Sequence, residues 1–373
     1  MQKIREELRL LEENGQYRKI PQIQNKASNK IVINNNSYIN LASNDYLGLS
    51  TRTDLINEFL EQNKSLLSSA SARLLTGSSL EYTELERTLT KLFNKEGALI
   101  YNTGYQCNLG VISALISKGD VVFSDKLNHA SIIDGMCLAK GDYIRYKHLD
   151  YADLEKKLKT KRNEYNRAII ISESVFSMDG DIADIDKLVE LKNKYNCLLM
   201  IDEAHAFCAV GEELAGISFG KDVDIITATF GKALGSFGAF CVSNNDIINY
   251  LINKSRSFIF STSIPPINIA WSNWLLTIKR DEIINQKNKL NTLTSKVLNL
   301  LKDSTSKSHI VPIIIGSNEE TLRISEKLKS EGYYVPAIRP PTVPEGTSRL
   351  RLSLTAETKF EDIERIFKII HES

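Results

Sequence analysis

The sequence predicts an α/β protein with a large, mainly parallel-sheet domain and a smaller C-terminal α+β domain. Two observations predict this class. Short apolar runs alternate with helical stretches between residues 45 and 275, and the order strand, helix, strand, strand, helix follows nearer the C-terminus. Apolar runs separated by helices are typical of a parallel sheet that is covered on both faces. At 373 residues, with 42% hydrophobic residues, the chain is long enough for more than one domain.

The N-terminal segment, residues 1–44, is predicted to hold a helix and a hairpin. Residues 1–19 have Ile4, Leu8 and Leu11 at helical spacing, which indicates an amphipathic helix. The segment that begins KIVINNNSYIN then alternates like a short hairpin.

The large domain is predicted over residues 45–275. Its clearest strands are ALIYN (98–102), DVVFSD (120–125), RAIIISES (167–174), CLLMIDEAH (197–205), DIITATF (224–230) and GAFCVS (238–243). Ligands of such sheets bind beyond the carboxyl ends of the strands. We therefore expect the polar residues that follow these strands to form the functional site.

The small domain is predicted over residues 276–373. A long helix over 267–303 leads into it. The elements that follow are a strand (309–316), a helix (318–331), the strand GYYVPAI, the strand SRLRLSLT and a last helix (357–371).

Composition excludes several functional classes. A formal net charge of +1 signals neither a nucleic-acid binder nor a membrane-surface protein. The five cysteines are scattered and lack CxxC spacing, so neither a disulfide framework nor a metal site is expected. The sequence shows no signal-peptide pattern and no apolar run of transmembrane length. We expect a cytoplasmic protein.

Lys232 is the first candidate for chemistry. It lies in ITATFGKALGSFGAF, between small residues and glycines that are poor partners for a solvated surface. A lysine that burial leaves uncharged is a nucleophile and can form an imine with the aldehyde cofactor pyridoxal phosphate (PLP). The ordinary alternative is a lysine in a surface loop.

Asp202 and His205 lie about thirty residues upstream, in IDEAH. A carboxylate at the end of an apolar strand can keep a pyridine nitrogen protonated, which makes the ring an electron sink. His205 can hydrogen-bond the ring hydroxyl of such a cofactor. The alternatives are a strand cap or the acid motif of a nucleotide hydrolase, and the chain has no GxxxxGK[ST] loop to support the latter.

A phosphate site is predicted after the strand ALIYN. Gly104 and Tyr105 stand at a helix start, where free N–H groups and the helix dipole attract an anion. Thr229, three residues before Lys232, can add a hydroxyl. His129 follows another strand and can stack on a cofactor ring; a helix cap or a surface histidine is the alternative.

Three arginines, Arg339, Arg349 and Arg351, cluster near the C-terminus. Arg349 and Arg351 alternate on a predicted strand and so face the same side. An arginine can bind a carboxylate through two parallel hydrogen bonds. The alternative is a solvated strand face.

The chain resembles the α-oxoamine synthase family of fold-type I PLP enzymes, from about residue 43 to residue 356. The motifs that carry the resemblance are SNDYLGLS, NHAS, ESVFSMDGDIADI, IDEAH, TFGKALG, FSTSIPP and RPPTVPEGTSRLRLSLTA. The last of these is the most specific for a subfamily.

The resemblance implies a role for each matching residue at the cofactor. Lys232 would carry PLP as an imine, Asp202 would pair with the pyridine nitrogen, and His129 would stack on the ring. His205 and Ser177 would contact the region of the ring hydroxyl. The remaining cofactor contacts would come from Gly104, Tyr105 and Thr229, and from Ser261 or Thr262, which would reach the phosphate in the neighbouring subunit of a homodimer.

The resemblance also implies substrate contacts. Arg351 matches the residue that binds the amino-acid carboxylate, and Asn44 matches a residue near that carboxylate. Thr342 and Arg18 match positions that touch the acyl substrate, and His129 would also face the substrate.

The chain departs from the family pattern at three places. SSASARLLTG (68–77) stands where a glycine-rich stretch is usual, and Tyr82 stands where a histidine is usual. After His205 the family favours glycines, whereas this chain has Ala206, Phe207 and Cys208. We expect these three side chains to crowd the entrance near the ring.

The activity that the resemblance implies is the decarboxylative condensation of L-alanine with a pimeloyl thioester, carried by coenzyme A or by an acyl-carrier protein. One rival is a sister synthase such as a glycine C-acetyltransferase. A second is simple transamination, and a third is a non-catalytic partner subunit that keeps the fold. The sequence does not distinguish the acyl carrier or define the chain length.

Overall fold

The computed structural model describes residues 1–301 and 305–373. The chain divides into two compact units. The larger unit comprises Arg52–Ser177 and Ile182–Lys287, and the smaller unit comprises Met1–Thr51, Met178–Asp181 and Asn288–Ser373. The predicted N-terminal and C-terminal segments thus belong to one unit, because a strand from each pairs with the other.

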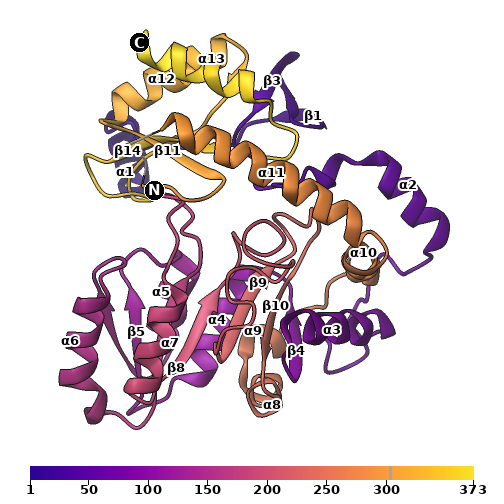
Figure 1. Cartoon of the computed structure of the whole chain (residues 1–373). Coiled ribbons are helices and arrows are strands. Elements are labelled where there is room, and N and C mark those ends of the chain that lie inside the picture. Colours follow the sequence, from indigo (N-terminus) through magenta and orange to yellow (C-terminus); the bar gives the residue numbers. More distant parts are fainter. Residues whose placement is uncertain (302–304) are drawn as a thin grey trace. The chain divides into compact units, whose positions relative to one another are not determined.

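A seven-stranded sheet forms the centre of the larger unit (Figure 1). Its strands, from one edge to the other, are β4 (Gly97–Tyr101), β10 (Ala239–Ser243), β9 (Ile225–Thr229), β8 (Leu198–Asp202), β7 (Ala168–Glu173), β5 (Val121–Asp125) and β6 (Asp142–Tyr146). β6, β5, β7, β8 and β9 pair in parallel, and β10 is antiparallel to both of its neighbours. The predicted mainly parallel α/β class is confirmed.

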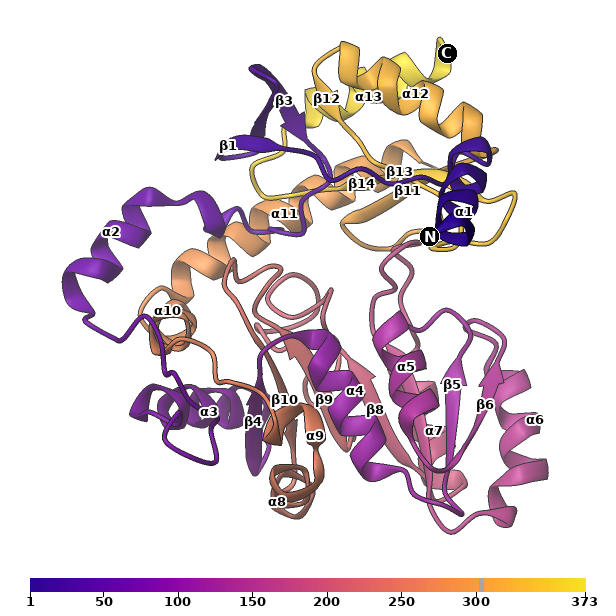
Figure 2. The same ribbon diagram turned by 180° about the vertical axis from the view of Figure 1, so that it is seen from behind.

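Helices cover this sheet because its strands are apolar on both faces. Every residue of β4, β5, β7 and β10 is buried, as expected for strands with helices on each side. The helices of the larger unit are α2 (Thr53–Gln62), α3 (Leu80–Phe93), α4 (Gly104–Leu115), α5 (Ala130–Leu138), α6 (Tyr151–Lys161), α7 (Ile185–Lys194), α8 (Asn245–Lys254), α9 (Arg256–Ile259) and α10 (Pro266–Thr277). α4 and α5 lie side by side (Figure 2).

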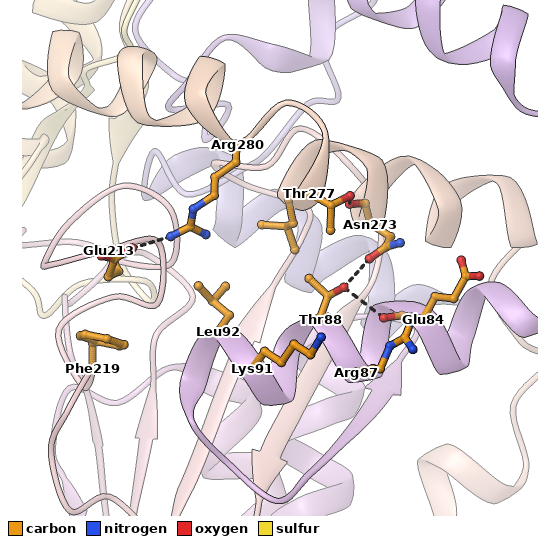
Figure 3. A pocket seen from close by; sticks show the side chains of 11 residues that line it. Glu84, Arg87, Thr88, Lys91, Leu92, Glu213, Phe219, Asn273, Thr277 and Arg280 are labelled. Atoms are coloured by element: carbon orange, nitrogen blue, oxygen red, sulfur yellow. Dashed lines mark hydrogen bonds and ion pairs between the residues drawn. The ribbon is translucent and has the colours of Figure 1, made fainter.

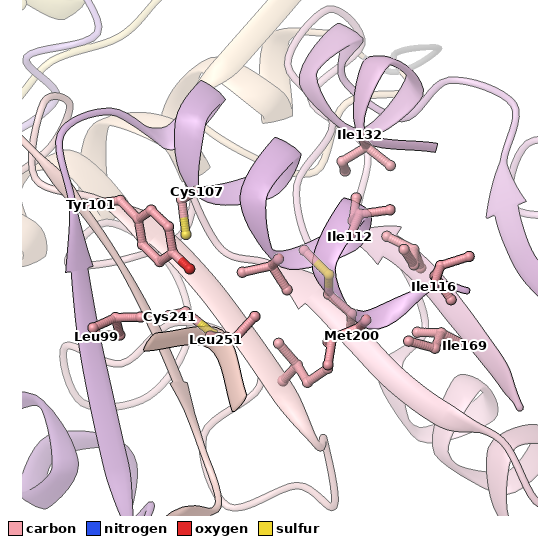
Figure 4. Close-up of a cluster of buried hydrophobic side chains, with 14 of the residues drawn as sticks. Leu99, Tyr101, Cys107, Ile112, Ile116, Ile132, Ile169, Met200, Cys241 and Leu251 are labelled. Carbon is pink, nitrogen blue, oxygen red and sulfur yellow. The ribbon is translucent and has the colours of Figure 1, made fainter. Parts of the chain in front are cut away.

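The core between α4 and the sheet is drawn in Figure 4. Cys107 and Ile112 of α4 meet Met200 of β8 and Cys241 of β10 in one buried cluster. Burial of each such side chain contributes about 1.5–3 kcal/mol relative to its exposure to water. This packing fixes the start of α4 against the ends of the central strands, where the candidate site lies.

The smaller unit holds two further sheets. One has the order β1-β2-β3-β12 and the other β11-β14-β13. The elements are α1 (Gln2–Glu13), β1 (Ile23–Ala27), β2 (Lys30–Ile33), β3 (Asn36–Asn40), β11 (Ile310–Gly316), α12 (Asn318–Ser330), β12 (Tyr333–Tyr334), β13 (Ala337–Ile338), β14 (Ser348–Ser353) and α13 (Phe360–His371). β2 and β3 form the predicted hairpin.

The single helix predicted over 267–303 is wrong. The structure has α10 and a separate helix α11 (Arg280–Leu300), with a break at Ile278 and Lys279. Asp281 and Glu282 in the first turn of α11 favour a new helix start, because carboxylates stabilise the positive end of the helix dipole. The predicted end at residue 303 lies outside the described residues.

Two shorter elements also differ from prediction. GYYVPAI is not one strand: Pro336 separates β12 from β13, which join different sheets. β6 was missed because it is a largely exposed edge strand, DYIRY, without an apolar run. Among the described residues, no helix has the length and apolar character needed to cross a membrane.

Candidate active site

Lys232 lies in a tight loop between β9 and β10. The backbone N–H of Phe230 donates to the carbonyl of Gly238 at 2.9 Å, and that of Ser236 donates to the carbonyl of Phe230 at 3.0 Å. Gly238 has φ +114°, a conformation that favours glycine. The loop leaves Lys232 half-buried, with its Nζ 2.7 Å from Nε2 of His205.

Asp202 and His205 come from the end of β8. Asp202 is the last residue of the strand and is only 6% exposed. Its Oδ1 accepts a hydrogen bond from the backbone N–H of Ala204 at 2.9 Å, which orients the carboxylate and begins the turn to His205. The structure therefore brings together the lysine and the histidine that the sequence separates by 27 positions.

A buried amide, Asn108 of α4, holds the other oxygen of this carboxylate. Asn108 Nδ2 donates to Asp202 Oδ2 at 2.7 Å and to Ser131 Oγ at 3.0 Å. Ser131 Oγ is in turn 2.8 Å from Nδ1 of His129. Sequence reasoning missed Asn108 and Ser131, because an amide or a hydroxyl on an otherwise apolar helix has no distinctive pattern.

His129 is the N-cap of α5, and the ring nitrogen Nδ1 accepts the backbone N–H of Ser131 at 3.2 Å. Burial lowers the pKa of His129, and the nearby charge of Lys232 acts in the same direction while that of Asp202 opposes it. The ring is therefore neutral at pH 7. The sequence left a helix-cap role open for His129, and this cap contact is one of those that orient the His129 ring.

Glu173 is a second residue that sequence reasoning missed. It ends β7, pairs in register with Asp202 of β8, and accepts the backbone N–H of His129 at 2.5 Å. Burial raises the pKa of Glu173 well above its usual value, and the charge of Asp202 adds to this. Its position at the end of an apolar strand, like that of Asp202, was the available signal.

The start of α4 lies against Thr229. Thr103 caps this helix by accepting the backbone N–H of Gln106 at 3.1 Å, which leaves the N–H groups of Gly104 and Tyr105 at the first turn. A Cβ added to Gly104 would meet Thr229 Cβ at 3.7 Å and no other atom within 4 Å. This open space beside a helix N-terminus suits an anion.

Tyr105, Ser177 and the FSTS segment complete the predicted cofactor residues. The Tyr105 ring is edge-on to His129 at 6.4 Å between centroids, and its hydroxyl contacts Asp134. Ser261 Oγ accepts Gln106 Nε2 at 3.3 Å, and the carbonyl of Thr262 accepts Asn102 Nδ2 at 2.7 Å. Ser177 lies in the loop after β7 and is half-buried.

Apart from His129, which lies in the larger unit, the predicted substrate residues form two pairs within the smaller unit. Arg351 of β14 is buried, with one guanidinium nitrogen 2.5 Å from Ser353 Oγ and the other 3.5 Å from Asn44 Oδ1. Arg18 donates to Thr342 Oγ1 at 3.0 Å. Arg339 donates to the carbonyl of Gly15, which is close to Arg18 in the sequence.

Arg349 has a structural partner. Its guanidinium forms a buried ion pair with Asp179, which belongs to the short segment Met178–Asp181 of the same unit. A charge that is already paired in this way is not available to a substrate carboxylate. The role of Arg349 is therefore to stabilise the smaller unit.

The three departures from the family pattern have structural explanations. Arg73, in the 68–77 segment, pairs with Glu86 at 2.5 Å and lies over the ring of Tyr82 at 4.0 Å. The Tyr82 hydroxyl donates to the carbonyl of Ile264 at 3.1 Å, and burial raises the pKa of Tyr82 to about 12.

The expectation that residues 206–208 crowd the cofactor entrance is wrong for Phe207. Its ring packs in the core against three other phenylalanines, Phe93, Phe230 and Phe240. Ala206 and Cys208 are also fully buried. These three side chains therefore pack in the core and stabilise the turn that carries His205.

A separate cavity of about 650 Å³ lies between α3, the 213–219 loop and the junction of α10 with α11 (Figure 3). Its cationic side chains are Arg87, Lys91 and Arg280, and Arg280 is paired with Glu213. Two of its lining residues are bonded to each other, with Thr88 donating to Asn273 Oδ1 at 2.6 Å. None of the predicted site residues lines it.

The larger unit thus gathers a primary amine, a buried carboxylate, two imidazoles and a helix N-terminus around the ends of β8 and β9. A lysine beside a histidine is a candidate nucleophile or base. The carboxylate can hold a protonated ring nitrogen and the helix end a phosphate.

The chain is similar to known proteins over nearly its whole length. The family model for aminotransferase class I and II matches residues 36–370. A Glaesserella parasuis protein named "Putative 8-amino-7-oxononanoate synthase" is 42% identical over 97% of this chain and 98% of its own. A Pasteurella multocida protein of the same name is 40% identical over 97% and 96%.

Solved structures are also similar to this chain over most of its length. Serine palmitoyltransferase of Sphingomonas wittichii has a TM-score of 0.88 at 29% identity, covering 99% of this chain and 95% of its own. The S. paucimobilis serine palmitoyltransferase with PLP and myriocin bound has a TM-score of 0.86 at 28% identity, with coverage of 99% and 96%. The 8-amino-7-oxononanoate synthase of Francisella tularensis has a TM-score of 0.75 at 27% identity, with coverage of 90% and 97%.

Proposed function

We propose that this chain, which belongs to the aminotransferase class I and II family and within it to the α-oxoamine synthases, condenses L-alanine with a pimeloyl thioester. The products are 8-amino-7-oxononanoate, carbon dioxide and the free carrier thiol, a step of biotin biosynthesis. The observation that carries the proposal is identity of 42% and 40%, over nearly full length, to relatives named "Putative 8-amino-7-oxononanoate synthase". The segment RPPTVPEGTSRLRLSLTA, which contains Thr342 and Arg351, supports it.

The cofactor is pyridoxal 5'-phosphate, and the residues of the larger unit fit it. The aldehyde needs a primary amine, the ring nitrogen a carboxylate and the phosphate a set of N–H donors. Lys232, Asp202 and the start of α4 supply these groups, and Gly104 leaves space beside Thr229. When bound, PLP supplies an aldehyde that joins amines and a ring that withdraws electrons from the bond being broken.

The protein's own groups then hold and move protons. Asp202 would keep the ring nitrogen protonated, because its buried carboxylate is oriented by Asn108 and Ala204. Lys232 Nζ, 2.7 Å from His205 Nε2, is the base that would take the α-proton of the bound amino acid. His129, which is neutral and forms the N-cap of α5, would cover one face of the cofactor ring and orient the substrate.

The other proposed substrate contacts come from residues of the smaller unit. Arg351 would bind the alanine carboxylate, since a guanidinium offers parallel donors to two oxygens, and Asn44 would add a contact. Arg18 and Thr342, already joined by a hydrogen bond, would contact the acyl chain.

The proposed assembly is a cytoplasmic homodimer. Apolar side chains are exposed along one stretch of the larger unit, at Leu66, Leu67, Leu74, Leu75 and Leu80. This stretch is joined to the FSTS segment by the bridge between Ala72 and Thr262. A second copy on this surface would cover these side chains and place Ser261 or Thr262 near its partner's phosphate. Light scattering that finds only monomers at micromolar concentration would contradict this assembly.

The experiment that tests the function is a matrix of alanine, glycine and serine against pimeloyl, acetyl and palmitoyl thioesters. We expect product and thiol release to be greatest for alanine with a pimeloyl thioester. A preference for glycine with acetyl would instead identify the sister synthase. The Lys232→Ala variant is the control and should lack both turnover and the visible absorbance of bound PLP.

A further inference from the structure

Asn108 is the centre of a buried hydrogen-bond network that links two predicted active-site residues. The side chain is 2% exposed and lies on α4, about one turn from the start of the helix. Its Nδ2 donates to Asp202 Oδ2 at 2.7 Å and to Ser131 Oγ at 3.0 Å. Its Oδ1 accepts the Thr227 hydroxyl at 2.9 Å. Both amide protons and one lone pair of the amide oxygen are thus used.

The direction of each hydrogen bond follows from the chemistry of the groups. An ionised carboxylate only accepts, so the amide nitrogen of Asn108 must face Asp202. The second amide proton goes to Ser131 Oγ, which leaves the Ser131 hydroxyl proton for Nδ1 of His129 at 2.8 Å. The backbone N–H of Ser131, which cannot be reversed, donates to the same Nδ1 at 3.2 Å. Nδ1 of His129 therefore has two donors and no proton of its own.

We propose that Asn108 is a positioning residue that ties the Asp202 carboxylate to the His129 ring, and that through Ser131 it keeps the ring proton of His129 on Nε2. The inference deepens the proposed function and rests on it for the roles of Asp202 and His129. The tautomer itself follows from Asn108 and Ser131 alone. It makes the exposed ring nitrogen of His129 a donor, which suits a ring that must hold an electron-rich substrate atom.

The charged groups around His129 agree with a neutral ring. Lys232 and Asp202 act on it with opposite sign, and Glu173 accepts its backbone N–H. Burial lowers the pKa of His129 and raises that of Glu173, and both shifts favour the uncharged form of the side chain.

The test is ¹⁵N NMR of the PLP-bound enzyme labelled at histidine. The chain has five histidines, so the ring nitrogens of His129 can be assigned by substitution. We expect a protonated Nε2 and an unprotonated Nδ1 for His129. A proton on Nδ1 in the unmodified enzyme would overturn the proposal.

Three variants separate the links of the network. Ser131→Ala removes the hydroxyl but keeps the backbone donor, and should shift the His129 ring signals while PLP affinity changes by less than about threefold. Asn108→Ala should shift the same signals and also weaken PLP binding about tenfold or more, as expected when a charged group loses one hydrogen bond. Ser113→Ala, on the same helix with its hydroxyl bonded to the Leu109 carbonyl, is the matched control and should change neither.

The outcomes remain interpretable if one variant does not fold. Ser131→Ala leaves the core amide in place, so unchanged His129 signals in that variant alone would overturn the link. Equal loss of PLP affinity in Ser131→Ala and Asn108→Ala would also overturn it, because Ser131 has no bond to Asp202. If the product assay fails but the His129 signals behave as expected, the proposed function fails and the network stands.

Discussion

Replacement of Glu203 by alanine should destabilise the larger unit through the turn that carries His205. Glu203 is fully buried, directly after Asp202. Its carboxylate accepts the Ser174 hydroxyl at 2.6 Å, the Ser218 backbone N–H at 2.6 Å and the Ile217 backbone N–H at 3.2 Å. It also contacts the Ser218 hydroxyl. One side chain thus joins β7, β8 and the 217–218 loop.

The magnitude follows from the donors that lose their acceptor. The two hydroxyls can rotate to other partners, but the two backbone N–H groups cannot. A buried donor without a partner costs about 1–3 kcal/mol, so the pair gives about 2–6 kcal/mol. Removing the carboxylate also relieves its own desolvation, which raises the pKa of Glu203 in the folded protein. We therefore expect a net loss of about 3 kcal/mol, a large share of the stability of a typical domain.

Urea unfolding followed by tryptophan fluorescence measures this loss. Both tryptophans, Trp271 and Trp274, lie on α10 of the larger unit and are stacked at 5.4 Å, so their emission reports on that unit. The Glu203→Gln variant is the matched comparison, because it keeps an acceptor oxygen and the side-chain volume. Because the two backbone N–H groups bind different oxygens of Glu203, glutamine leaves one of them without an acceptor, and the variant should lose about half as much.

Two results would refute the reasoning. A loss below about 1 kcal/mol in Glu203→Ala would mean that the backbone donors find other partners, including water. Equal losses in the alanine and glutamine variants would mean that the negative charge, and not the acceptor count, stabilises the turn.

The remaining predictions concern the site. Asp202→Asn should weaken PLP binding and turnover by at least roughly 100-fold, because loss of one partner of a buried charge pair costs about 3–5 kcal/mol; PLP titration measures this, and tight binding by the variant would contradict it. His129 should titrate below its ordinary value of 6.5, because burial lowers its pKa; stability falls as pH drops from 6.5 towards that lowered pKa, because the unfolded chain takes up the proton first, and activity falls as pH drops below the lowered pKa. An NMR titration midpoint at or above 6.5 would contradict that prediction. Arg351→Lys should raise the KM for alanine about 10–100-fold with little change in kcat, since lysine cannot offer two parallel donors; an unchanged KM would remove Arg351 from the alanine site.

Most of the fold could be predicted because the central strands are continuous apolar runs. The predicted starts of β7 and β8 lie within one or two residues of the observed starts. Continuous apolar sequences such as IIIS and LLMI are typical of strands that helices cover on both faces. β6 and β1 have no such run, because each is exposed over most of its length. The break between α10 and α11 was missed because helical periodicity continues through it, and only the acidic first turn of α11 marks the restart.

The site could be predicted in part for a similar reason. Lys232, Asp202 and His205 stand in unusual local sequence, and the structure brings the lysine and the histidine within hydrogen-bond distance. The roles of the individual site residues stay predictions. Asn108 and Ser131 could not be found, because Asn108 contacts Ser131 across 23 positions and Asp202 across 94. Glu173 bonds to His129 across 44 positions, and its only signal was its place at the end of an apolar strand. The ion pair of Arg349 with Asp179, 170 positions apart, was equally invisible in the sequence.

Isotope tracing of the product tests the central claim most directly. The enzyme would be supplied with a pimeloyl thioester and with alanine labelled with ¹³C at either C1 or C2. The account predicts 8-amino-7-oxononanoate that keeps the C2 label and loses the C1 label, with one labelled carbon dioxide and one thiol released per product. Retention of the C1 label, pyruvate in place of the condensed product, or no product from alanine while glycine or serine reacts would contradict it.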